Sequence, residues 1–477
     1  MVKIASIDIG STWTKGAIFD FNGSVLEFKA RAVHKTTVEN LSEGFFDVLS
    51  SLAPSYNNSL KGNGLELFYS SSAKGGLAVA VIGIVPDITL ATAKVAAFSA
   101  GAKISSYFSY HMTDADVFAL EQSMPDIVLF TGGTDGGNKE YVLSNAEQLS
   151  RSSLNCSIIY AGNRDLVDDV QSILSNKDLV IVENLLPEID VQNFQPARDA
   201  MRDIFLSKIV QGKGLQEIVD AVSQEPWPTP FAMHELSQYI CQFVPDWKEF
   251  MLLDLGGATT DVYSSHLEKI APGTVIRGLL EPEVKRTVEG DLGLRISAPT
   301  VIESNKTMLC HELSQSQQSL AEIEAYTGSL KESPEHISTE KNDSMMDALI
   351  AGSCIASACA RHVGRMHVVH TADGAVNVQL GRDLRKVEKM VGSGGFLANH
   401  EAFNPNDWLK KMPEDNRGRQ ILLPESVDYY QDRQYLLPLF ANIAQKYPEA
   451  AATSAINSLS FSSINSRQQD AVAHASF

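Results

Sequence analysis

The sequence predicts an α/β protein with two similar halves and a further α/β domain inserted into the first half. Two stretches, 4–20 and 250–262, share one pattern: an apolar strand that ends in Asp, a turn of glycine and hydroxyl residues, and a returning strand. Between them, residues 76–190 alternate strand-like and helical segments, as in a parallel sheet covered by helices. The length of 477 residues also exceeds what one hydrophobic core usually holds.

The stretch 250–262 has the more complete pattern. Four apolar residues, Phe250 to Leu253, run without alternation into Asp254, which indicates a strand buried on both faces. The turn that follows supplies closely approaching backbone amides and hydroxyl donors from Gly256, Gly257, Thr259 and Thr260. With the carboxylates of Asp254 and Asp261 beside it, this turn predicts a phosphate cradle next to a hydrated Mg²⁺. A plain glycine hairpin between two core strands is the alternative.

The stretch 4–20 repeats the pattern. Its first strand ends in Asp8, and a second strand returns to Asp20. The turn and the start of the second strand carry Gly10, Ser11, Thr12 and Lys15. Two such hairpins predict an internally duplicated fold that holds a nucleotide between its halves.

The first half and the inserted domain follow in order. A strand at 25–33, a helix near 39–52, a loop at 54–64 and a strand at 65–70 continue the first half. The strands expected in the inserted domain are Ala78–Ile84, Ile104–Tyr110, Ile127–Phe130, Cys156–Tyr160 and Leu179–Val182. Its helices are expected near 89–100, 115–123, 140–152 and 164–175. Any ligand of such a sheet would bind at the carboxyl ends of its strands.

One of these carboxyl ends carries a glycine-rich loop, Gly132 to Gly137. The loop can receive a phosphate, a nucleotide or a loop of a partner, or it can be a simple turn with Asn138 capping the next helix. It has neither the glycine spacing of a dinucleotide fingerprint nor the lysine of a P-loop. Both interpretations stay open.

Residues 191–249 are expected to return to the first half and then cross to the second. The pattern predicts an amphipathic helix at 196–222, a proline-rich segment at 225–230 and a helix that carries His234. A lone histidine without a partner is more typical of a polar helix residue than of a catalytic base.

The second half contains further expected elements. These are a loop at 277–279 that faces a substrate or partner, a glycine loop at 290–297, solvated helices at 314–343 and a helix of small residues at 345–364. The spacing of His362, His367 and His370 suits neither a helix face nor a strand face, so we expect them to be structural or exposed. Two strands at 376–395 end in a turn with Gly394 and Gly395, where a side chain would block an approaching ligand.

Composition excludes several classes of function. The chain has 39 basic and 58 acidic side chains and a net charge of −19, so binding to nucleic acid or to an anionic membrane is not expected. No signal peptide pattern is found, and no uncharged apolar run approaches the ~18 residues of a membrane span. The 5 cysteines form no C-x-x-C motif, and reduced cysteines in a cytoplasmic protein are the default expectation.

The two hairpins resemble the phosphate-1 and phosphate-2 motifs of the ASKHA superfamily, which includes acetate and sugar kinases, heat-shock chaperone ATPases and actin. The segment 225–236 resembles its connect-1 segment, and 391–396 resembles its adenosine motif. The resemblance implies duplicated ribonuclease H-like lobes and an inserted Rossmann-like domain. It divides the chain into 1–75, the start of the first lobe, 76–190, the inserted domain, 191–249, the return and crossing, 250–450, the second lobe, and 451–477, a flexible tail.

The same resemblance implies roles for individual residues, with ATP and Mg²⁺ as cofactors. Asp8 and Asp254 would hold Mg²⁺ through water and take part in catalysis. Gly10, Ser11, Thr12 and Lys15 would grip the phosphates from one lobe, and Gly256, Gly257, Thr259 and Thr260 from the other. Gly394 and Gly395 would face the adenosine.

At a finer level, the segments 8–15, 130–138, 253–264 and 290–295 resemble the glutamate mutase accessory (GlmL/MutL-type) family. That family is regarded as ATP-dependent reactivators of adenosylcobalamin mutases such as glutamate mutase and ornithine aminomutase. The resemblance implies that ATP-driven lobe motion opens the mutase and releases damaged cobalamin. The chain lacks the Asp-x-His-x-x-Gly motif with which mutase subunits ligate cobalamin. A small-molecule kinase and a non-catalytic nucleotide-binding scaffold are the alternatives.

Overall fold

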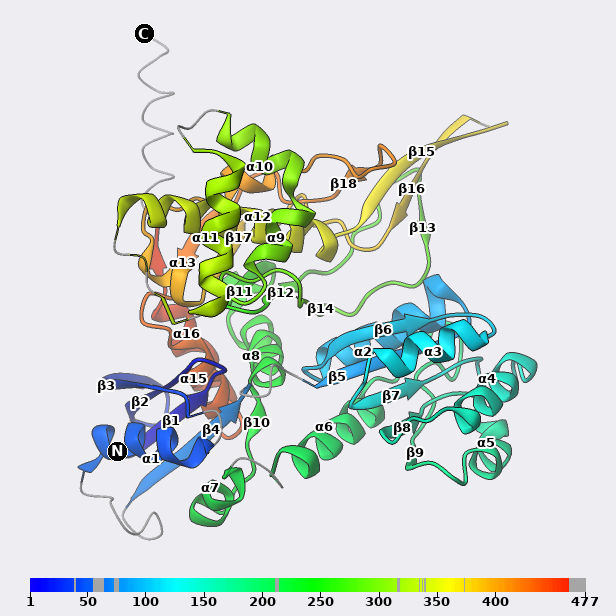
Figure 1. Cartoon of the computed structure of the whole chain (residues 1–477), viewed down its shortest axis with the longest axis horizontal. Helices are drawn as coiled ribbons and strands as arrows, with labels where there is room; N and C mark the ends of the chain where they lie inside the picture. Colours follow the sequence, from blue (N-terminus) through cyan, green and yellow to red (C-terminus); the bar gives the residue numbers. More distant parts are fainter. Residues whose placement is uncertain are drawn as a thin grey trace.

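The computed structural model describes residues 1–37, 40–54, 64–72, 77–210, 214–314, 318–333, 335–336, 338, 340–372 and 374–462. Most of the loop expected at 54–64, residues 211–213 within the helix expected at 196–222, and the tail from 463 lie outside the described residues. Within the described ranges the strands form four sheets, of which two belong to the lobes, one to the inserted domain and one to a projecting ribbon (Figure 1).

The two lobes are built on sheets of the same topology. The first sheet contains β1 (Val2–Ile9), β2 (Trp13–Phe21), β3 (Leu26–Lys35), β4 (Leu65–Ser71) and β10 (Trp227–Pro228), in the order β10-β4-β1-β2-β3. The second contains β11 (Phe250–Leu255), β12 (Thr260–Ser265), β14 (Val284–Glu289), β17 (Lys389–Ser393), β19 (Asp428–Gln431) and β20 (Ser460–Phe461), in the order β14-β12-β11-β17-β19-β20. In each, a three-stranded antiparallel meander is extended by two strands parallel to its first strand, and in the second sheet β20 adds an antiparallel edge. The predicted duplication is confirmed.

The inserted domain is a parallel sheet, as predicted. Its strands are β5 (Ala78–Ile82), β6 (Lys103–Phe108), β7 (Ile127–Phe130), β8 (Ser157–Tyr160) and β9 (Leu179–Ile181), in the order β6-β5-β7-β8-β9. Its helices are η2 (Pro86–Leu90), α2 (Ala91–Ser99), α3 (Asp114–Gln122), α4 (Glu140–Arg151), η3 (Arg164–Leu166) and α5 (Val167–Ile173). On the α2 side, Val79 and Ala97 share one hydrophobic core with Ile7 and Tyr69 of the first lobe. The inserted domain is therefore joined to the first lobe by a shared hydrophobic core as well as by the polypeptide backbone.

A layer of helices fills the space between the two lobe sheets. It consists of α8 (Thr229–Phe243), α15 (Leu437–Ile443) and α16 (Pro448–Asn457), whose core joins Phe19 of the first lobe to Phe250 of the second. The expectation of a flexible tail from residue 451 is therefore wrong for its first part, because the alanines of α16 are buried there. Sequence analysis missed this because a run of small and polar residues gives a weak periodic signal.

The remaining helices lie around these layers. They are α1 (Leu41–Leu52), α6 (Gln195–Val210), α7 (Leu215–Val222), η4 (Pro245–Trp247), α9 (Ala298–Ser304), α10 (Lys306–Leu313), α11 (Leu320–Glu332), α12 (Lys341–His362), α13 (Gly395–Asn399) and α14 (Asn406–Leu409). The single helix expected at 196–222 is thus two helices, α6 and α7. As predicted, the small residues of α12 let it pack closely on the second sheet. In the part of the chain that is described, no helix has the length and apolar character to cross a membrane.

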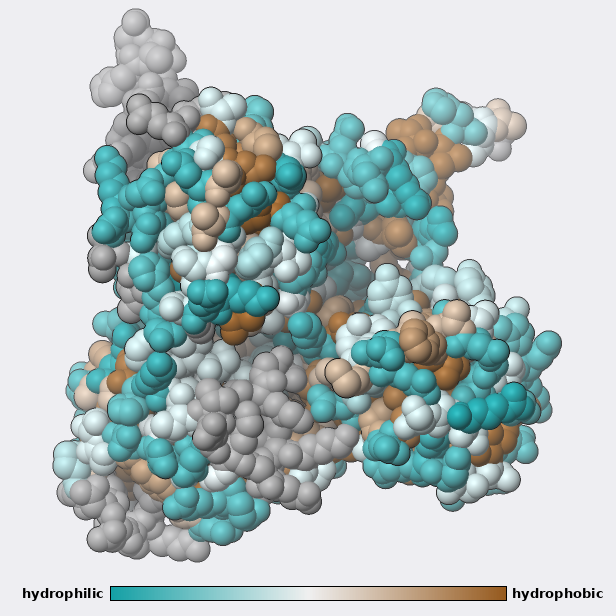
Figure 2. All heavy atoms as spheres, viewed as in Figure 1, coloured by the Kyte–Doolittle hydropathy of each residue, from teal (hydrophilic) through white to brown (hydrophobic). Residues whose placement is uncertain are grey.

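A β-ribbon projects from the second lobe and lies above the inserted domain in the view of Figure 1. It is made of β13 (Thr274–Arg277), β15 (Arg365–Thr371), β16 (Gly374–Leu380) and the short β18 (Gln420–Ile421), in the order β13-β16-β15-β18. Val275, Val368 and Val369 are exposed on it, and Figure 2 shows apolar atoms gathered along the ribbon. Strand β15 was not predicted, because two of its seven residues are histidines.

The buried position of α16 gives a test of this fold. Replacing Ala452, which is 0% exposed, with Asp places an unpaired carboxylate in the layer between the lobes. We expect Ala452→Asp to lower the melting temperature by at least ~5 °C. Asn457→Asp, on the exposed end of the same helix, should change it by less than ~2 °C. Equal melting temperatures for the two variants would contradict the packing of α16.

Candidate functional site

The two glycine turns have the same backbone geometry. In the first hairpin Asp8 pairs with Lys15 across the strands, and in the second Asp254 pairs with Asp261. The Gly10 N–H donates to the carbonyl of Trp13 at 3.2 Å, and the Gly256 N–H donates to that of Thr259 at 2.9 Å. A Cβ on Gly10 would lie 2.7 Å from the Trp13 carbonyl oxygen, so this turn requires glycine. The structure therefore places equivalent turns at equivalent positions of the two lobes.

Lys15 lies where the two hairpins meet. Burial lowers the pKa of its ammonium, while the nearby carboxylates of Asp8, Asp254 and Asp432 raise it. Its Nζ atom also lies 3.2 Å from the centre of the Tyr435 ring, in a cation–π contact. Lys15 and Asp8 belong to the first lobe and the other two carboxylates to the second, so this cluster of charges spans both lobes.

Asp8 is held by two hydroxyl groups. Its Oδ1 atom accepts hydrogen bonds from Thr229 at 2.7 Å and from Ser70 at 3.0 Å. Burial raises the pKa of Asp8, and these hydrogen bonds and the charge of Lys15 lower it. Thr229 is the first residue of α8, so the helix that crosses between the lobes begins at this carboxylate.

Asp254 has the fewest hydrogen-bond donors of the carboxylates around Lys15. Burial raises its pKa to about 7, with further raising contributions from Asp261, Asp8 and Asp432 against the lowering effect of Lys15. Among the described residues, no side-chain or backbone group donates a hydrogen bond to its carboxylate. Because the negative charges outnumber the ammonium, the site favours an additional cation.

Asp432 and Tyr435 are site residues that sequence analysis missed. Strands β11, β17 and β19 run parallel, and their register brings Asp254, Ser393 and Asp432 to the same level of the sheet. Asp432 accepts hydrogen bonds from the Ser393 hydroxyl at 3.1 Å and from the backbone N–H of Leu436 at 2.8 Å. Burial raises its pKa. An aspartate directly after a buried strand was the signal available in the sequence.

Tyr435 has a backbone conformation that is rare for a bulky side chain. Its φ angle is 53°, in the left-handed region. Strained residues of this kind gather at ligand sites, where surrounding contacts hold them in place. Here the contact is the one between its ring and the Lys15 ammonium.

The glycine loop expected at 290–297 is hydrogen-bonded to the second glycine turn. The carbonyl of Gly256 accepts the N–H of Leu294 at 3.1 Å, and that of Gly257 accepts the N–H of Arg295 at 2.8 Å. A Cβ on Gly293 would lie 2.7 Å from Cα of Ala258. The two loops are therefore in direct backbone contact.

Thr260 does not have the position expected of a phosphate ligand. Its side chain is 0% exposed, and its hydroxyl donates to the carbonyl of Leu292 at 2.8 Å. Thr260 is the first residue of β12 and its side chain points into the core, so its hydroxyl fixes the supporting loop instead. Thr259 is partly exposed, and its hydroxyl lies 3.3 Å from a carboxylate oxygen of Asp261.

The third glycine turn adjoins the second hairpin. Gly394 has a φ angle of 103°, and a Cβ there would collide with the carbonyl of Leu255 at the end of β11. A Cβ on Gly395 would meet no atom within 4 Å, so this glycine borders open space. Gly394 is thus buried against the protein itself, and Gly395 is the position that could face a ligand at the end of the sheet.

The histidines considered in the sequence are not part of the site. His234 is buried in α8, and burial lowers its pKa well below the usual value. His362 is buried and bonded to the hydroxyls of Ser264 at 2.7 Å and Thr287 at 2.8 Å, whereas His370 is exposed. The expectation that they are structural or exposed is confirmed for these residues.

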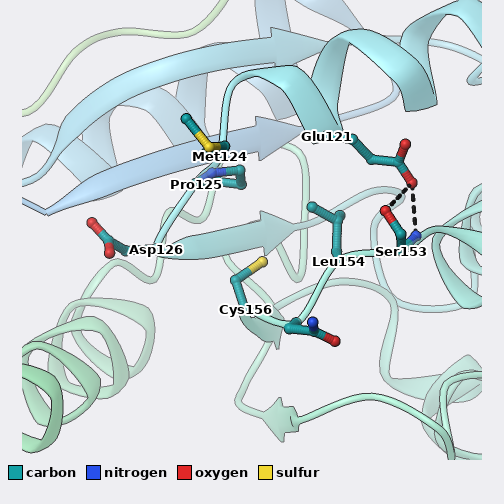
Figure 3. A pocket seen from close by; sticks show the side chains of 8 residues that line it. Glu121, Met124, Pro125, Asp126, Ser153, Leu154 and Cys156 are labelled. Carbon is teal, nitrogen blue, oxygen red and sulfur yellow. Dashed lines mark hydrogen bonds between the residues drawn. The ribbon is translucent and has the colours of Figure 1, made fainter.

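Two other features of the inserted domain lie away from this site. The loop from Gly132 to Gly137 follows β7 at the carboxyl edge of the sheet, and Asn138 accepts the Tyr141 N–H at 3.0 Å, as expected for a cap. A hollow lined by Glu121 and Cys156 lies at the opposite edge, where β7 and β8 begin (Figure 3). Ligands of such sheets bind at the carboxyl edge, so this hollow is not the predicted crevice.

The donor set of the charge cluster fits a hydrated magnesium ion. Carboxylate oxygens are the ligands that Mg²⁺ prefers, and it usually keeps several waters while one or two carboxylates and the substrate phosphates hold it. Among the described residues, no group of three His, Cys, Asp or Glu side chains can hold a metal ion directly. Asp8 and Asp254 are the candidates for an indirect contact through water.

The comparison with protein families then decides the relationship. The model of the family described as "MutL protein" matches residues 4–459. The chain belongs to the MutL protein family. Protein MutL from Clostridium tetanomorphum is 32% identical over 457 residues, which cover 93% of this chain and 96% of the relative. The match extends past residue 450 to α16, in agreement with the buried position of that helix.

Three solved structures have a remote similarity to this MutL-family chain. The ATP-dependent caprolactamase from Pseudomonas jessenii is 11% identical, with a TM-score of 0.37, over 92% of this chain and 70% of its own. The Ppx/GppA phosphatase from Aquifex aeolicus is 9% identical, with a TM-score of 0.24, over 96% and 91%. A nucleotide-free diol dehydratase-reactivating factor is 10% identical, with a TM-score of 0.23, over 63% and 74%. The fold assignment rests on the topology of the two lobe sheets.

The contact between the two glycine loops predicts the effect of a methyl group. Gly293→Ala should push Ala258 and the second turn out of place and weaken ATP binding at least ~10-fold, as measured by equilibrium binding of a fluorescent ATP analogue. Gly328→Ala is the matched control, because a Cβ at this exposed position of α11 meets no atom within 4 Å. Equal affinities for the two variants would remove the 290–297 loop from the site.

The raised pKa of Asp254 predicts how stability depends on pH. A carboxyl group whose folded-state pKa is about 7 instead of 3.8 stabilises the folded protein at low pH, and this contribution is lost as the pH rises toward 7. Without nucleotide or Mg²⁺, Asp254→Asn should therefore melt a few degrees (~2–4 °C) above the wild type at pH 8. The difference in melting temperature between Asp254→Asn and the wild type should shrink as the pH falls from 7 to 5. A variant at the exposed Asp190, Asp190→Asn, should show no such pH dependence.

Proposed function

We propose that the chain binds Mg²⁺ and ATP between its lobes and hydrolyses the ATP. The observation that carries this proposal is the position of Lys15, a first-lobe ammonium surrounded by Asp8, Asp254 and Asp432 from both lobes. A lysine among carboxylates, next to two turns of glycine and hydroxyl residues, is suited to a triphosphate and its metal ion. Closure of the lobes would complete the contacts with the phosphates.

The proposed roles follow the positions of the residues. Asp8 and Asp254 hold Mg²⁺ through water and orient the attacking water, with Asp432 adding negative charge beside Lys15. Gly10, Ser11, Thr12 and Lys15 contact the phosphates from the first lobe, and Gly256, Gly257 and Thr259 contact them from the second. Gly394 and Gly395 lie against the adenosine. Thr260 keeps its supporting role, because its hydroxyl is already bonded to Leu292.

We propose that the chain uses this ATP to reactivate an adenosylcobalamin-dependent mutase in the cytoplasm. Membership of the MutL protein family supports this part, since that family is regarded as accessory to mutases of the glutamate mutase and ornithine aminomutase type. Lobe motion driven by ATP would open the mutase and release damaged cobalamin. The motion would also reach the inserted domain, because that domain shares its core with the first lobe.

A turnover assay tests the proposal directly. The purified chain is incubated with Mg²⁺ and ATP, with and without glutamate mutase carrying hydroxocobalamin, and phosphate, phosphorylated metabolites and free cobalamin are measured. Mutase-dependent release of hydroxocobalamin together with ATP hydrolysis supports the proposal. A phosphorylated metabolite would indicate a kinase, and a chain that binds no ATP would indicate a scaffold.

The charge of Asp254 should be essential for turnover. Asp254→Asn keeps the shape of the side chain but loses the carboxylate that faces the metal, so we expect kcat for ATP hydrolysis to fall ~100-fold or more. Asp190→Asn should hydrolyse ATP at the wild-type rate. Unchanged turnover in Asp254→Asn would remove Asp254 from the mechanism.

A further inference from the structure

One turn of the inserted domain packs against helix α8 and against strand β14 of the second lobe. It runs from Phe98 to Lys103 and joins the end of α2 to the start of β6, next to β14 of the second lobe (Figure 1). Gly101 has a φ angle of 87°, and a Cβ there would lie 3.0 Å from the backbone nitrogen of Phe231 in α8. Phe231 is two residues beyond Thr229, the residue that donates to Asp8. The turn therefore packs against the helix start that positions the first-lobe carboxylate.

The same turn is bonded to the second lobe through Arg286 of β14. The Arg286 side chain is 2% exposed, and its Nη1 atom donates to the carbonyls of Phe98 at 2.7 Å and Ala102 at 3.1 Å. Its Nε and Nη2 atoms donate to Oδ1 of Asp261 at 2.8 and 2.6 Å. Asp261 is the strand partner of Asp254 in the second hairpin. One guanidinium thus joins the inserted domain to the hairpin that carries Asp254.

A third contact reaches the loop behind the second turn. The Lys103 side chain lies over Gly290, at the position that a Cβ on that glycine would occupy. The carbonyl of Gly290 accepts the Ser297 hydroxyl at 3.1 Å, and the same hydroxyl lies 2.7 Å from the carbonyl of Ala258. Lys103 therefore contacts a glycine that is linked to the second glycine turn through the Ser297 hydroxyl.

We propose that the Phe98–Lys103 turn couples the inserted domain to the nucleotide site, with Arg286 as the positioning residue that joins them. A movement of the inserted domain shifts the carbonyls that hold Arg286, and through Asp261 it shifts the hairpin of Asp254. Binding of a partner protein to the inserted domain then changes nucleotide affinity, and nucleotide binding changes the inserted domain by the same free energy. This inference rests on the proposed function, because it assumes a nucleotide between the lobes.

A double-mutant cycle in the full chain tests the coupling. The dissociation constant of a fluorescent, non-hydrolysable ATP analogue with Mg²⁺ is measured for Gly101→Ala, for Arg286→Lys and for the two combined. Arg286→Lys keeps the charge beside Asp261 but cannot bridge it to two carbonyls. Each single change should weaken binding ~5- to 10-fold. Because both changes act through the same Phe98–Lys103 turn, the double variant should be no more than ~2-fold weaker than the weaker-binding single variant.

Gly136→Ala is the matched control. Gly136 also lies in the inserted domain with a positive φ angle, 71°, but a Cβ there would approach only the Asp165 carboxylate, at 3.8 Å. The Gly136→Ala variant therefore has a similar backbone strain without the contact to the lobes. Its affinity for the ATP analogue should stay within ~2-fold of that of the wild type. An equal loss of affinity in Gly136→Ala and Gly101→Ala, or effects of Gly101→Ala and Arg286→Lys that multiply, would overturn the coupling.

Hydrogen exchange gives a second measurement that needs no variant. In the wild type, the ATP analogue should slow amide exchange in the peptide that covers Phe98 to Lys103 at least ~3-fold, and exchange at the distant Gly136 should not change. Nucleotide binding without this change would overturn the inference and leave the proposed function standing. A wild-type chain that binds no nucleotide would overturn both.

Discussion

The electrostatic balance around Lys15 is the constraint on which the candidate site depends. One ammonium group compensates carboxylates that come from both lobes: Asp8 from the first, and Asp254 and Asp432 from the second. Burial raises the pKa of each of these carboxyl groups, because a charged carboxylate loses its hydration there. A cation brought in with a nucleotide would relieve this shortage of positive charge. The same charges that destabilise the ligand-free protein at neutral pH thus favour binding of a metal ion.

The duplicated topology explains how this balance is built. Equivalent hairpins place Lys15 in one lobe and Asp261 in the other at the same register position, so the two lobes present opposite charges at equivalent points. The core of α8, α15 and α16 holds the two sheets together, because it joins Phe19 of the first lobe to Phe250 of the second. The inserted domain contacts this arrangement from the side, where the charge of Asp261 is already paired with Arg286. The three parts are therefore joined by direct contacts close to the charge cluster.

Much of this architecture could be predicted from the sequence, because buried strands that end in Asp and Gly are recognisable without their partners. The hairpins at Asp8 and Asp254 and the parallel sheet of the inserted domain are of this kind. The role of Asp432 could not be predicted, because it depends on three strands lying side by side, and Asp432 comes 178 positions after Asp254 in the chain (432 − 254). The orientation of Thr260 was equally hidden, since only the strand register shows that its hydroxyl points into the core. The path of α16 depends on packing against α8, which local patterns do not encode.

The most direct test of the account is a crystal structure of the chain with Mg²⁺ and a non-hydrolysable ATP analogue. The account predicts one triphosphate between the turns at Gly10 and Gly256, with its metal ion beside Asp8 and Asp254 and its base over Gly395. A nucleotide bound instead at the Gly132–Gly137 loop of the inserted domain, with the charges around Lys15 unchanged, would contradict it.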